Sequence, residues 1–322
     1  MKSDVVLGID IGGTNTAFGL VDCSGNCLFK KSIPTRSDEP AENLFDRIFD
    51  IVNHKLTENS LSLTGIGVGA PNANYYKGTI ETPPNLGWNY VDVVATVAKF
   101  SRLPVFVTND ANAAALGEMK FGAAREMKNF IEVTLGTGLG SGIIVNGELV
   151  YGNDGFAGEM GHTIIEWNGR ECGCGRRGCL ETYVSATGIV RTYFHLLGES
   201  MEKSYLKFKV TSEITAKDIY DAALNEDPVA LRAFDLTAMY LGRACADAVA
   251  YFSPEAIILF GGLAGAGKLI TEPTKKYMEE NLLNFFKNKV NIVLSELNEG
   301  DAAILGAAAL AWHNIGENVK TV

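Results

Sequence analysis

LGIDIGGTNTAFGLVDCSGN, residues 7–26, is the stretch that most restricts the fold. An apolar run ends at a glycine-rich turn, a second apolar run follows, and an Asx/Gly turn closes the segment. The stretch IEVTLGTGLGSGIIVNGELV, residues 131–150, has the same order and places Gly136 where the first has Gly12. Two unrelated hairpins could give one weak match. The similar order of elements after each segment favours an internal duplication instead.

Strands and helices alternate along the rest of the chain. Apolar runs predict strands at 27–33, 64–69, 105–108, 256–260 and 290–294. Apolar spacings of three and four predict helices around 44–56, near 91–100, from 111, near 186–197, 216–225, 228–252 and 267–287, and at 302–313. This order predicts a duplicated α/β fold with an insertion at about 152–185 and a ligand in the cleft between the halves.

Composition restricts the function classes. The chain has 322 residues, is 47% hydrophobic and carries a formal net charge of −10, which predicts two domains and opposes binding to nucleic acids or anionic membranes. The apolar segment 5–11 is interrupted by Asp10 and is too short to span a membrane, and no secretion signal opens the chain. We therefore expect a cytoplasmic protein, in which clustered cysteines are metal ligands or catalysts more often than disulfides.

Three glycine turns follow predicted strands, and each can present backbone N–H groups to a phosphate. They are DIGGTNT with Gly12, Gly13 and Thr14, LGTGLGSG with Thr137 and Gly138, and LFGGLAGAGK at 259–268. Any one of them could be an ordinary hairpin or helix start, and none is a Walker A or a GxGxxG dinucleotide motif. Three in one chain favour nucleotide binding.

Two acidic residues stand beside these features. Asp10 precedes the first glycine turn, where a carboxylate can bind Mg²⁺ through a bridging water molecule. The alternative is that Asp10 is a capping carboxylate. Asp110 follows a strand and precedes a helix, so it could be a simple helix N-cap. As a functional residue, Asp110 would accept the proton of a hydroxyl that attacks a γ-phosphate.

Several turns carry groups suited to a polyol. PPNLGW supplies Asn85, GVGAPN supplies the backbone near Gly69, and GEMGH supplies Glu159 and His162. Carboxylates and amides that converge on one pocket suit a sugar, because its hydroxyls need paired donors and acceptors.

CGCGRRGCLE, residues 172–181, holds half of the six cysteines. With the preceding histidine it makes a Cys₃His set typical of structural zinc: His162, Cys172, Cys174 and Cys179. The C-x-C spacing is tighter than the common C-x-x-C knuckle. A redox or disulfide cluster is the alternative, and it fits a reducing compartment less well.

These motifs together resemble the ROK family of sugar kinases and repressors, within the actin-like, hexokinase-like ATPase superfamily. The resemblance covers the whole chain and rests on DIGGTNTAFGLVD, NDANAAALGE, LGTGLGSG, GEMGH and the H-x₉-C-x-C-G-x-x-G-C-x-E arrangement from His162 to Glu181.

The resemblance implies roles for particular residues. Asp110 would be the catalytic base, and the sugar would be held by Asn109, Glu159, His162 and Glu181. ATP would be surrounded by Gly12–Thr14, Thr137–Gly138 and Gly261–Gly262.

The resemblance also implies an architecture. Two actin-like (ribonuclease H-like) domains are expected, one from 1–115 plus 301–322 and one from 116–300, with an interdomain cleft and a zinc loop at 162–181. A homodimer is a further expectation from the family.

The expected activity is ATP-dependent phosphorylation of a hexose, with glucose as the leading substrate. An N-acetylmannosamine kinase or a fructokinase would use nearly the same site. A sugar-sensing repressor would carry a helix-turn-helix ahead of the kinase-like part, and a first strand that begins at residue 5 leaves no room for one. A catalytically inactive sugar-binding module is a third possibility, against which the presence of Asp10 and Asp110 argues.

Overall fold

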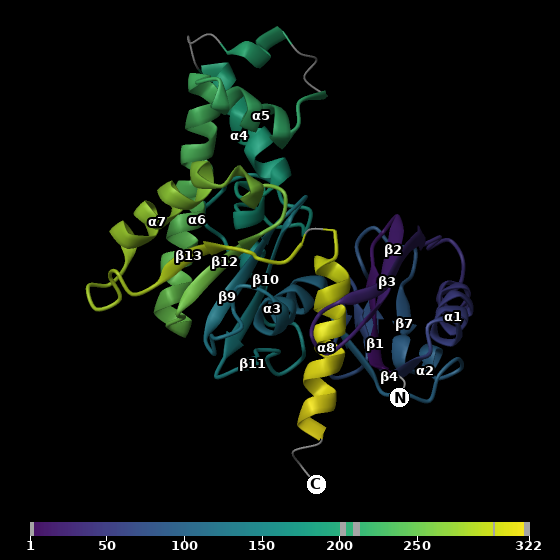
Figure 1. Cartoon of the computed structure of the whole chain (residues 1–322). Coiled ribbons are helices and arrows are strands. Elements are labelled where there is room, and N and C mark those ends of the chain that lie inside the picture. The colour runs from purple at the N-terminus through teal and green to yellow at the C-terminus, as the bar shows by residue number, and fades with distance from the viewer. Residues whose placement is uncertain (1–2, 200–203, 209–212, 299, 319–322) are drawn as a thin grey trace. The chain divides into compact units, whose positions relative to one another are not determined.

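The computed structural model describes residues 3–199, 204–208, 213–298 and 300–318. Its described residues divide into two compact units. One lies within 1–127, 142–157 and 296–322, and the other within 128–141 and 158–295. Figure 1 labels the helices and strands.

The first five-stranded sheet has the order β3-β2-β1-β4-β8. Strand β1 runs antiparallel to β2 and parallel to β4, and β4 runs parallel to β8. The strands are β1 (Ser3–Ile11), β2 (Asn15–Val21), β3 (Cys27–Pro34), β4 (Leu61–Gly69) and β8 (Val105–Thr108).

A second five-stranded sheet has the order β11-β10-β9-β12-β13, which repeats the arrangement of the first. Strand β12 runs parallel to both β9 and β13, as β4 does to β1 and β8. The strands are β9 (Phe130–Leu135), β10 (Leu139–Val145), β11 (Glu148–Leu149), β12 (Ala256–Phe260) and β13 (Asn291–Leu294). The α/β class with mixed sheets is thus confirmed.

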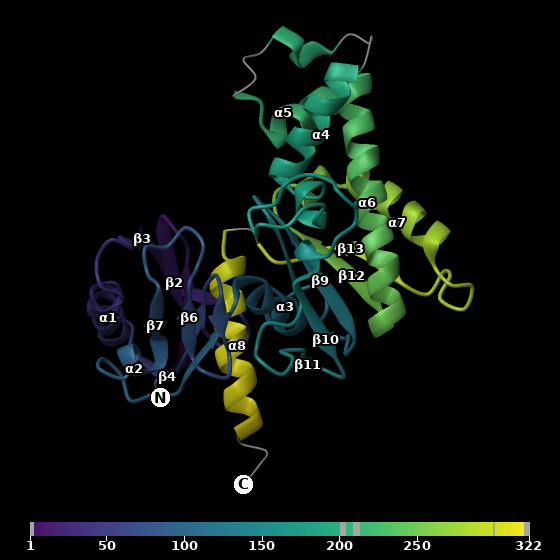
Figure 2. The same ribbon diagram turned by 180° about the vertical axis from the view of Figure 1, so that it is seen from behind.

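Helices cover both faces of the first sheet. The helix α1 (Ala41–Glu58) and the short α2 (Val93–Val97) lie on one face, and α8 (Ala302–Asn318) lies on the other beside α3 (Asp110–Phe121) (Figures 1 and 2). Helix α1 buries the apolar stripe that its spacing predicted, including Leu44, Phe45, Ile48 and Val52.

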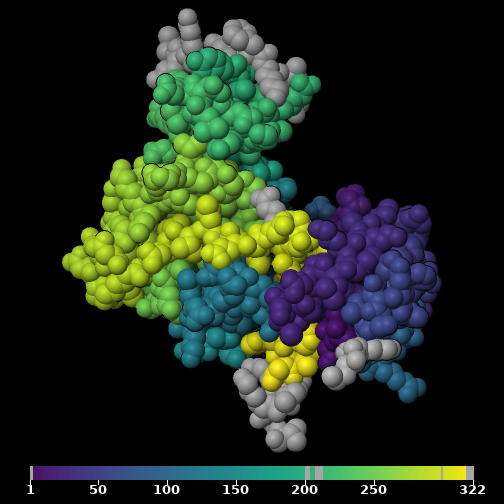
Figure 3. Space-filling view, viewed as in Figure 1, coloured from purple at the N-terminus to yellow at the C-terminus, as the bar shows by residue number. Residues whose placement is uncertain are grey.

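Helix α8 packs unusually close to the first sheet. A Cβ atom built on Gly67 of β4 would lie 1.8 Å from the carbonyl oxygen of Ala307, and one on Gly8 of β1 would lie 2.4 Å from that of Ile304. Because Gly67 and Gly8 have no side chain, the backbone of α8 can approach the sheet this closely. In the space-filling view, N-terminal residues cover the middle of this helix (Figure 3).

The second unit is largely helical outside its strands. Helix α6 (Pro228–Phe252) packs along α7 (Lys268–Asn281), and α4 (Ala186–Glu199) and α5 (Ala216–Leu224) contact α6 (Figure 1). Helix α6 has the predicted bounds because Asp227 accepts hydrogen bonds from the N–H groups of Val229 and Ala230, and Ser253 ends it in the left-handed conformation.

Two helix predictions were too long. Residues 90–92 form strand β7 (Tyr90–Asp92), and Asp92 caps α2 by accepting the N–H of Ala95 at 2.8 Å. Strand β7 joins β5 (Ala73–Asn74) and β6 (Thr79–Glu81) in a small sheet that the sequence analysis did not predict.

Helix α7 stops at Asn281, six residues before the predicted end. The side-chain amide of Asn281 donates to the carbonyl of Tyr277 at 2.7 Å, and the carboxylate of Glu279 accepts the N–H of Asn288. These bonds close the chain into a turn. In the described part of the chain, no helix combines the length and the hydropathy that a bilayer crossing requires.

Candidate functional site

The carboxyl ends of three parallel strands meet at one edge of the first sheet. Asp10 of β1 lies in register with Gly69 of β4, and Gly69 lies in register with Thr108 of β8. Asn109 and Asp110 follow β8 directly. The sheet therefore brings together Asp10, Gly69 and the pair Asn109–Asp110, which were predicted from three separate sequence motifs.

The first glycine turn is a tight connection between β1 and β2. The N–H of Gly12 donates to the carbonyl of Asn15 at 3.0 Å, and the Thr35 hydroxyl donates to the Gly12 carbonyl at 2.6 Å. A Cβ on Gly12 would lie 2.8 Å from the Asn15 oxygen, and one on Gly13 would lie 2.7 Å from the Asn85 oxygen. Neither position accommodates a larger residue without a shift, so the turn can approach an anion with its backbone.

Asn109, rather than Asp110, is the N-cap of α3. Its side-chain oxygen accepts the N–H of Asn112 at 2.7 Å, whereas Asp110 is the first helical residue and accepts the N–H of Ala111 at 2.9 Å. The capping alternative for Asp110 is therefore wrong, and its carboxylate lies on the solvent-reachable surface of the helix start.

The two carboxyl groups lie among protein atoms and are close enough to interact, although the side chain of Asp110 is exposed to solvent. Burial and, to a smaller extent, the negative charge of Asp110 together raise the pKa of Asp10 to about 7. Surrounding protein atoms also raise the pKa of Asp110, against the lowering effect of its bond from Ala111. A pair of carboxylates that resist ionisation is typical of sites that bind cations or move protons.

Replacing Asp10 by Asn should stabilise the ligand-free protein in a pH-dependent way. A raised folded-state pKa means that the unfolded chain ionises first, so wild-type stability falls as pH rises from about 4 to about 7. The Asn variant lacks this penalty, and its melting temperature should exceed that of the wild type most at pH 8 and least near pH 4. Thermal unfolding in EDTA measures this difference.

Asp4→Asn is the matched control because Asp4 lies on the same strand with an exposed side chain. A stability gain in Asp10→Asn that did not change between pH 4 and pH 8 would contradict the assigned carboxyl environment.

In the second unit, the turn between β9 and β10 holds Thr137 and Gly138. The N–H of Gly136 donates to the carbonyl of Gly138 at 3.1 Å. Gly261 and Gly262 follow β12, which is the parallel neighbour of β9, and the N–H of Leu263 donates to the carbonyl of Leu135 at 3.1 Å. The two glycine turns thus lie at adjacent strand ends. A short 3₁₀ turn separates Gly262 from α7, so this helix does not start directly at the glycines.

Glu159 and His162 belong to a single helical turn. The N–H of His162 donates to the carbonyl of Glu159 at 3.0 Å. The turn is pressed against the start of β10, since a Cβ on Gly161 would lie 2.2 Å from the Leu139 oxygen. Glu181 reaches the same strand start, where it accepts the N–H of Leu139 at 3.0 Å. The second unit therefore gathers three of the proposed sugar ligands around Leu139.

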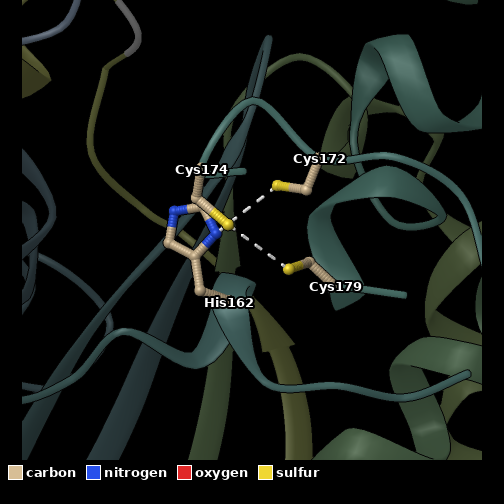
Figure 4. Close-up of side chains that lie close together, drawn as sticks. All are labelled: His162, Cys172, Cys174 and Cys179. Atoms are coloured by element: carbon tan, nitrogen blue, oxygen red, sulfur yellow. Dashed lines mark hydrogen bonds between the residues drawn. The ribbon is translucent and has the colours of Figure 1, made fainter. Parts of the chain in front are cut away.

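The four predicted metal ligands form one cluster (Figure 4). All of their ligand atoms lie within 4.8 Å of one another, with 3.7 Å between the Cys172 sulfur and His162 Nδ1 and 3.6 Å between the sulfurs of Cys174 and Cys179. Tetrahedral zinc with ordinary bond lengths separates its ligand atoms by about 3.5–3.8 Å. All six cysteines are free, so the disulfide alternative finds no support.

The thiols of the cluster differ in acidity. Burial disfavours a charge on Cys174, but hydrogen bonds from Arg176 outweigh it and lower the pKa of this thiol to about 6. Burial raises the pKa of Cys172 to about 12. The Arg176 guanidinium also donates to the carbonyl of His162 at 2.9 Å. Arg176 therefore stabilises both the loop and negative charge within it.

Arg170 is a structural residue that the sequence analysis missed. Its guanidinium stacks on the ring of Tyr183 and donates to the carbonyls of Thr182 and Gly188 and to the hydroxyl of Thr192. These bonds fasten the start of the cysteine loop to α4. In the sequence, the only indication of this role is that an arginine lies near the cysteine cluster. The sequence does not indicate which carbonyl groups accept its hydrogen bonds.

Comparison with known proteins agrees with this geometry. The model of the ROK family matches residues 6–314. The chain belongs to the ROK family. A glucokinase of Halalkalibacterium halodurans is 36% identical over 310 residues, which are 94% of each chain. A xylose repressor of Caldicellulosiruptor bescii is 31% identical, over 95% of this chain and 77% of the repressor.

Among solved structures, a ROK family glucokinase from Streptomyces griseus in complex with glucose and AMPPNP superposes with a TM-score of 0.78. The two are 34% identical, and the match covers 96% of this chain and 99% of the other. The two glucokinases are matched over nearly their full length, whereas the repressor is matched over 77% of its length, and this favours the kinase branch of the family.

Proposed function

We propose that the chain transfers the γ-phosphoryl group of ATP to the 6-hydroxyl of a hexose, and that the hexose is glucose. The observation that carries this proposal is the pair of carboxyl groups, Asp10 and Asp110, at the strand ends beside the glycine turn at 12–14. Phosphoryl transfer to an alcohol needs a phosphate cradle, a cation site and a proton acceptor, and this edge of the sheet holds a candidate for each of the three.

Asp110 is the proposed proton acceptor. As the 6-hydroxyl oxygen forms its bond to the γ-phosphorus, the bond from phosphorus to the β-phosphate oxygen breaks, and the hydroxyl proton passes to the Asp110 carboxylate. The raised pKa suits this role, because a carboxylate with a raised pKa is a stronger base than one with the ordinary pKa of an aspartate.

Asp10 is the proposed partner of Mg²⁺, which would neutralise phosphate charge when ATP is bound. Two adjacent carboxyl groups that disfavour their charged forms fit a divalent cation, since the cation relieves both burial and repulsion. The backbones of the glycine turns are the proposed phosphate contacts, at Gly12, Gly13, Thr14, Thr137, Gly138, Gly261 and Gly262.

Two sets of residues are proposed as sugar ligands. Gly69, Asn85, Asn109 and Asp110 belong to the first unit, and Glu159, His162 and Glu181 belong to the second. In the first set, the side-chain oxygen of Asn109 already accepts a hydrogen bond as the cap of α3. Its side-chain NH₂ group is therefore the part that is available to donate to a sugar oxygen.

Zinc is the proposed occupant of the cysteine cluster, held by Cys172, Cys174, Cys179 and Nδ1 of His162. The separations of the ligand atoms support this assignment. A closed set of four ligands leaves no position for a reacting water, so the metal has a structural role. It would fix the His162 ring so that Nε2 is presented to the sugar.

We also propose that the two similar sheets are the halves of a duplicated actin-like fold, with 162–181 as a zinc-binding insertion. Their equivalent strand orders support this proposal. A homodimer in the cytoplasm is the proposed working form.

A coupled ADP-release assay over a panel of sugars tests the function. With glucose, mannose, fructose, glucosamine, N-acetylglucosamine and N-acetylmannosamine, we expect the highest kcat/KM for glucose. A preference for N-acetylmannosamine or fructose would reassign the substrate within the family. Sugar binding without turnover for any of the six would favour a sugar-sensing regulator.

A further inference from the structure

Two of the three proposed phosphate turns contact a proposed sugar ligand of their own unit. In the first unit, the position of a Cβ on Gly13 is 2.7 Å from the backbone oxygen of Asn85. In the second, a Cβ on Gly138 would lie only 2.3 Å from Oε2 of Glu181. The neighbour of Gly13 is backbone, so glycine is required there, whereas the neighbour of Gly138 is the end of a side chain that an added methyl group would displace. No side chain separates either turn from its proposed sugar ligand.

The contact in the second unit also includes a hydrogen bond. Oε2 of Glu181 accepts the N–H of Leu139, the residue that follows Gly138, at 3.0 Å. Oε1 of the same carboxylate lies 3.7 Å from the sulfur of Cys172. One carboxylate thus touches both the glycine turn and the metal cluster.

The segment after Glu181 holds the rest of the same turn. The N–H of Ala186 donates to the carbonyl of Gly136 at 2.8 Å, and the hydroxyl of Thr187 donates to the carbonyl of Thr137 at 3.0 Å. Gly136, Thr137 and Leu139 are therefore all held by residues of 181–187, a segment that begins two residues after the last cysteine of the cluster.

We propose that Glu181 couples the two substrates, so that hexose binding and nucleotide binding strengthen each other through the turn 136–139. This inference rests on the proposed sugar-binding role of Glu181. A sugar hydroxyl that hydrogen-bonds to Glu181 would fix the position of the carboxylate, which accepts the N–H of Leu139. The turn would then already be ordered when ATP binds. By thermodynamic reciprocity, a nucleotide that orders the turn must tighten sugar binding by the same factor.

The central test is a methyl group placed in the nucleotide turn. Gly138→Ala would push the Glu181 carboxylate away, because the clash is with the end of a flexible side chain and not with backbone. We expect the Kd for glucose, measured calorimetrically without nucleotide, to rise about tenfold or more as a charged hydrogen bond is disturbed.

Gly136→Ala is the matched control. It adds the same methyl group to the same turn, but nothing lies within 4 Å of the added atom, and neither glycine has a left-handed backbone. Its glucose Kd should stay within about twofold of the wild-type value, well under the tenfold that one disturbed charged bond would cost. Equal glucose affinities in the two variants, whether both unchanged or both reduced, would overturn the proposed coupling.

A second arm covers the case in which Gly138→Ala fails to fold. In the wild type, saturating glucose should lower the Kd of Mg·AMPPNP about fivefold or more. In Glu181→Gln, which keeps the side-chain size but weakens the acceptor for Leu139, this factor should fall toward one. A Glu181→Gln enzyme with the full wild-type factor would also overturn the coupling. A wild-type protein that binds no glucose would instead contradict the proposed function.

Discussion

Replacing Asp110 by Asn is expected to lower kcat by ~10²–10⁴-fold, the usual cost of removing a general base. The amide keeps the shape of the carboxyl and its bond from the N–H of Ala111, but it cannot take the hydroxyl proton. The Kd for glucose should change little, and the fold should not weaken, because the surrounding protein atoms already disfavour the charged form of Asp110. Steady-state kinetics and glucose titration separate the two effects.

The pH profile gives a further readout. Wild-type kcat should fall on the acid side at a pH above the ordinary range of an aspartate, since protonation of a base with a raised pKa removes the acceptor. The variant should lack this limb. Asp92→Asn is the control, because Asp92 also accepts an N–H at a helix start but lies at α2. Near wild-type turnover in Asp110→Asn would exclude the proposed base.

Replacing Cys174 by Ser is expected to release the metal and raise the KM for the sugar at least about tenfold, with a smaller effect on the KM for ATP. The expected size corresponds to the loss of one or more substrate hydrogen bonds, because His162 and Glu181 both depend on the cluster for their positions. Thermal stability should also fall, since metal binding and folding of the loop are coupled. Elemental analysis beside sugar titration measures both outcomes.

Cys23→Ser is the control, because Cys23 is exposed and lies outside the cluster. It should keep metal content and sugar KM. About one zinc per chain is expected in the wild type. Metal-free wild-type protein with full sugar affinity would contradict the positional role of the cluster.

Local sequence predicted those parts of the molecule that local forces determine. The segments around Gly12 and Gly136 combine apolar runs with glycine, and both form the expected strand pairs. The Cys₃His set was also predictable, because four ligands within 18 residues can close on one ion with little help from the rest of the fold.

Features that depend on distant partners were not predictable. Asn109 and Asp110 are both good capping residues, and only the backbone at the end of β8 decides that Asn109 takes the role. Likewise, Tyr90–Asp92 has apolar spacing compatible with a helix, but pairing with β6 holds it as a strand. Strands of two or three residues are too short to show a period of their own.

The residues of the candidate site could be proposed from the sequence, but the contacts among them could not. Nothing in LGTGLGSG indicates that its second glycine, Gly138, faces a glutamate 43 residues later, since that contact arises from the packing of the cysteine loop. Similarly, the interaction of Asp10 with Asp110 follows from the register of three parallel strands.

Identification of the product formed from glucose and ATP tests the central claim most directly. Phosphorus NMR of the wild-type reaction with Mg²⁺ should show one ADP for each glucose phosphorylated, and the phosphate should be on the 6-oxygen. Release of ADP without a sugar phosphate, phosphate at another position, or no reaction with glucose would contradict the assignment of this chain as a glucose 6-phosphotransferase.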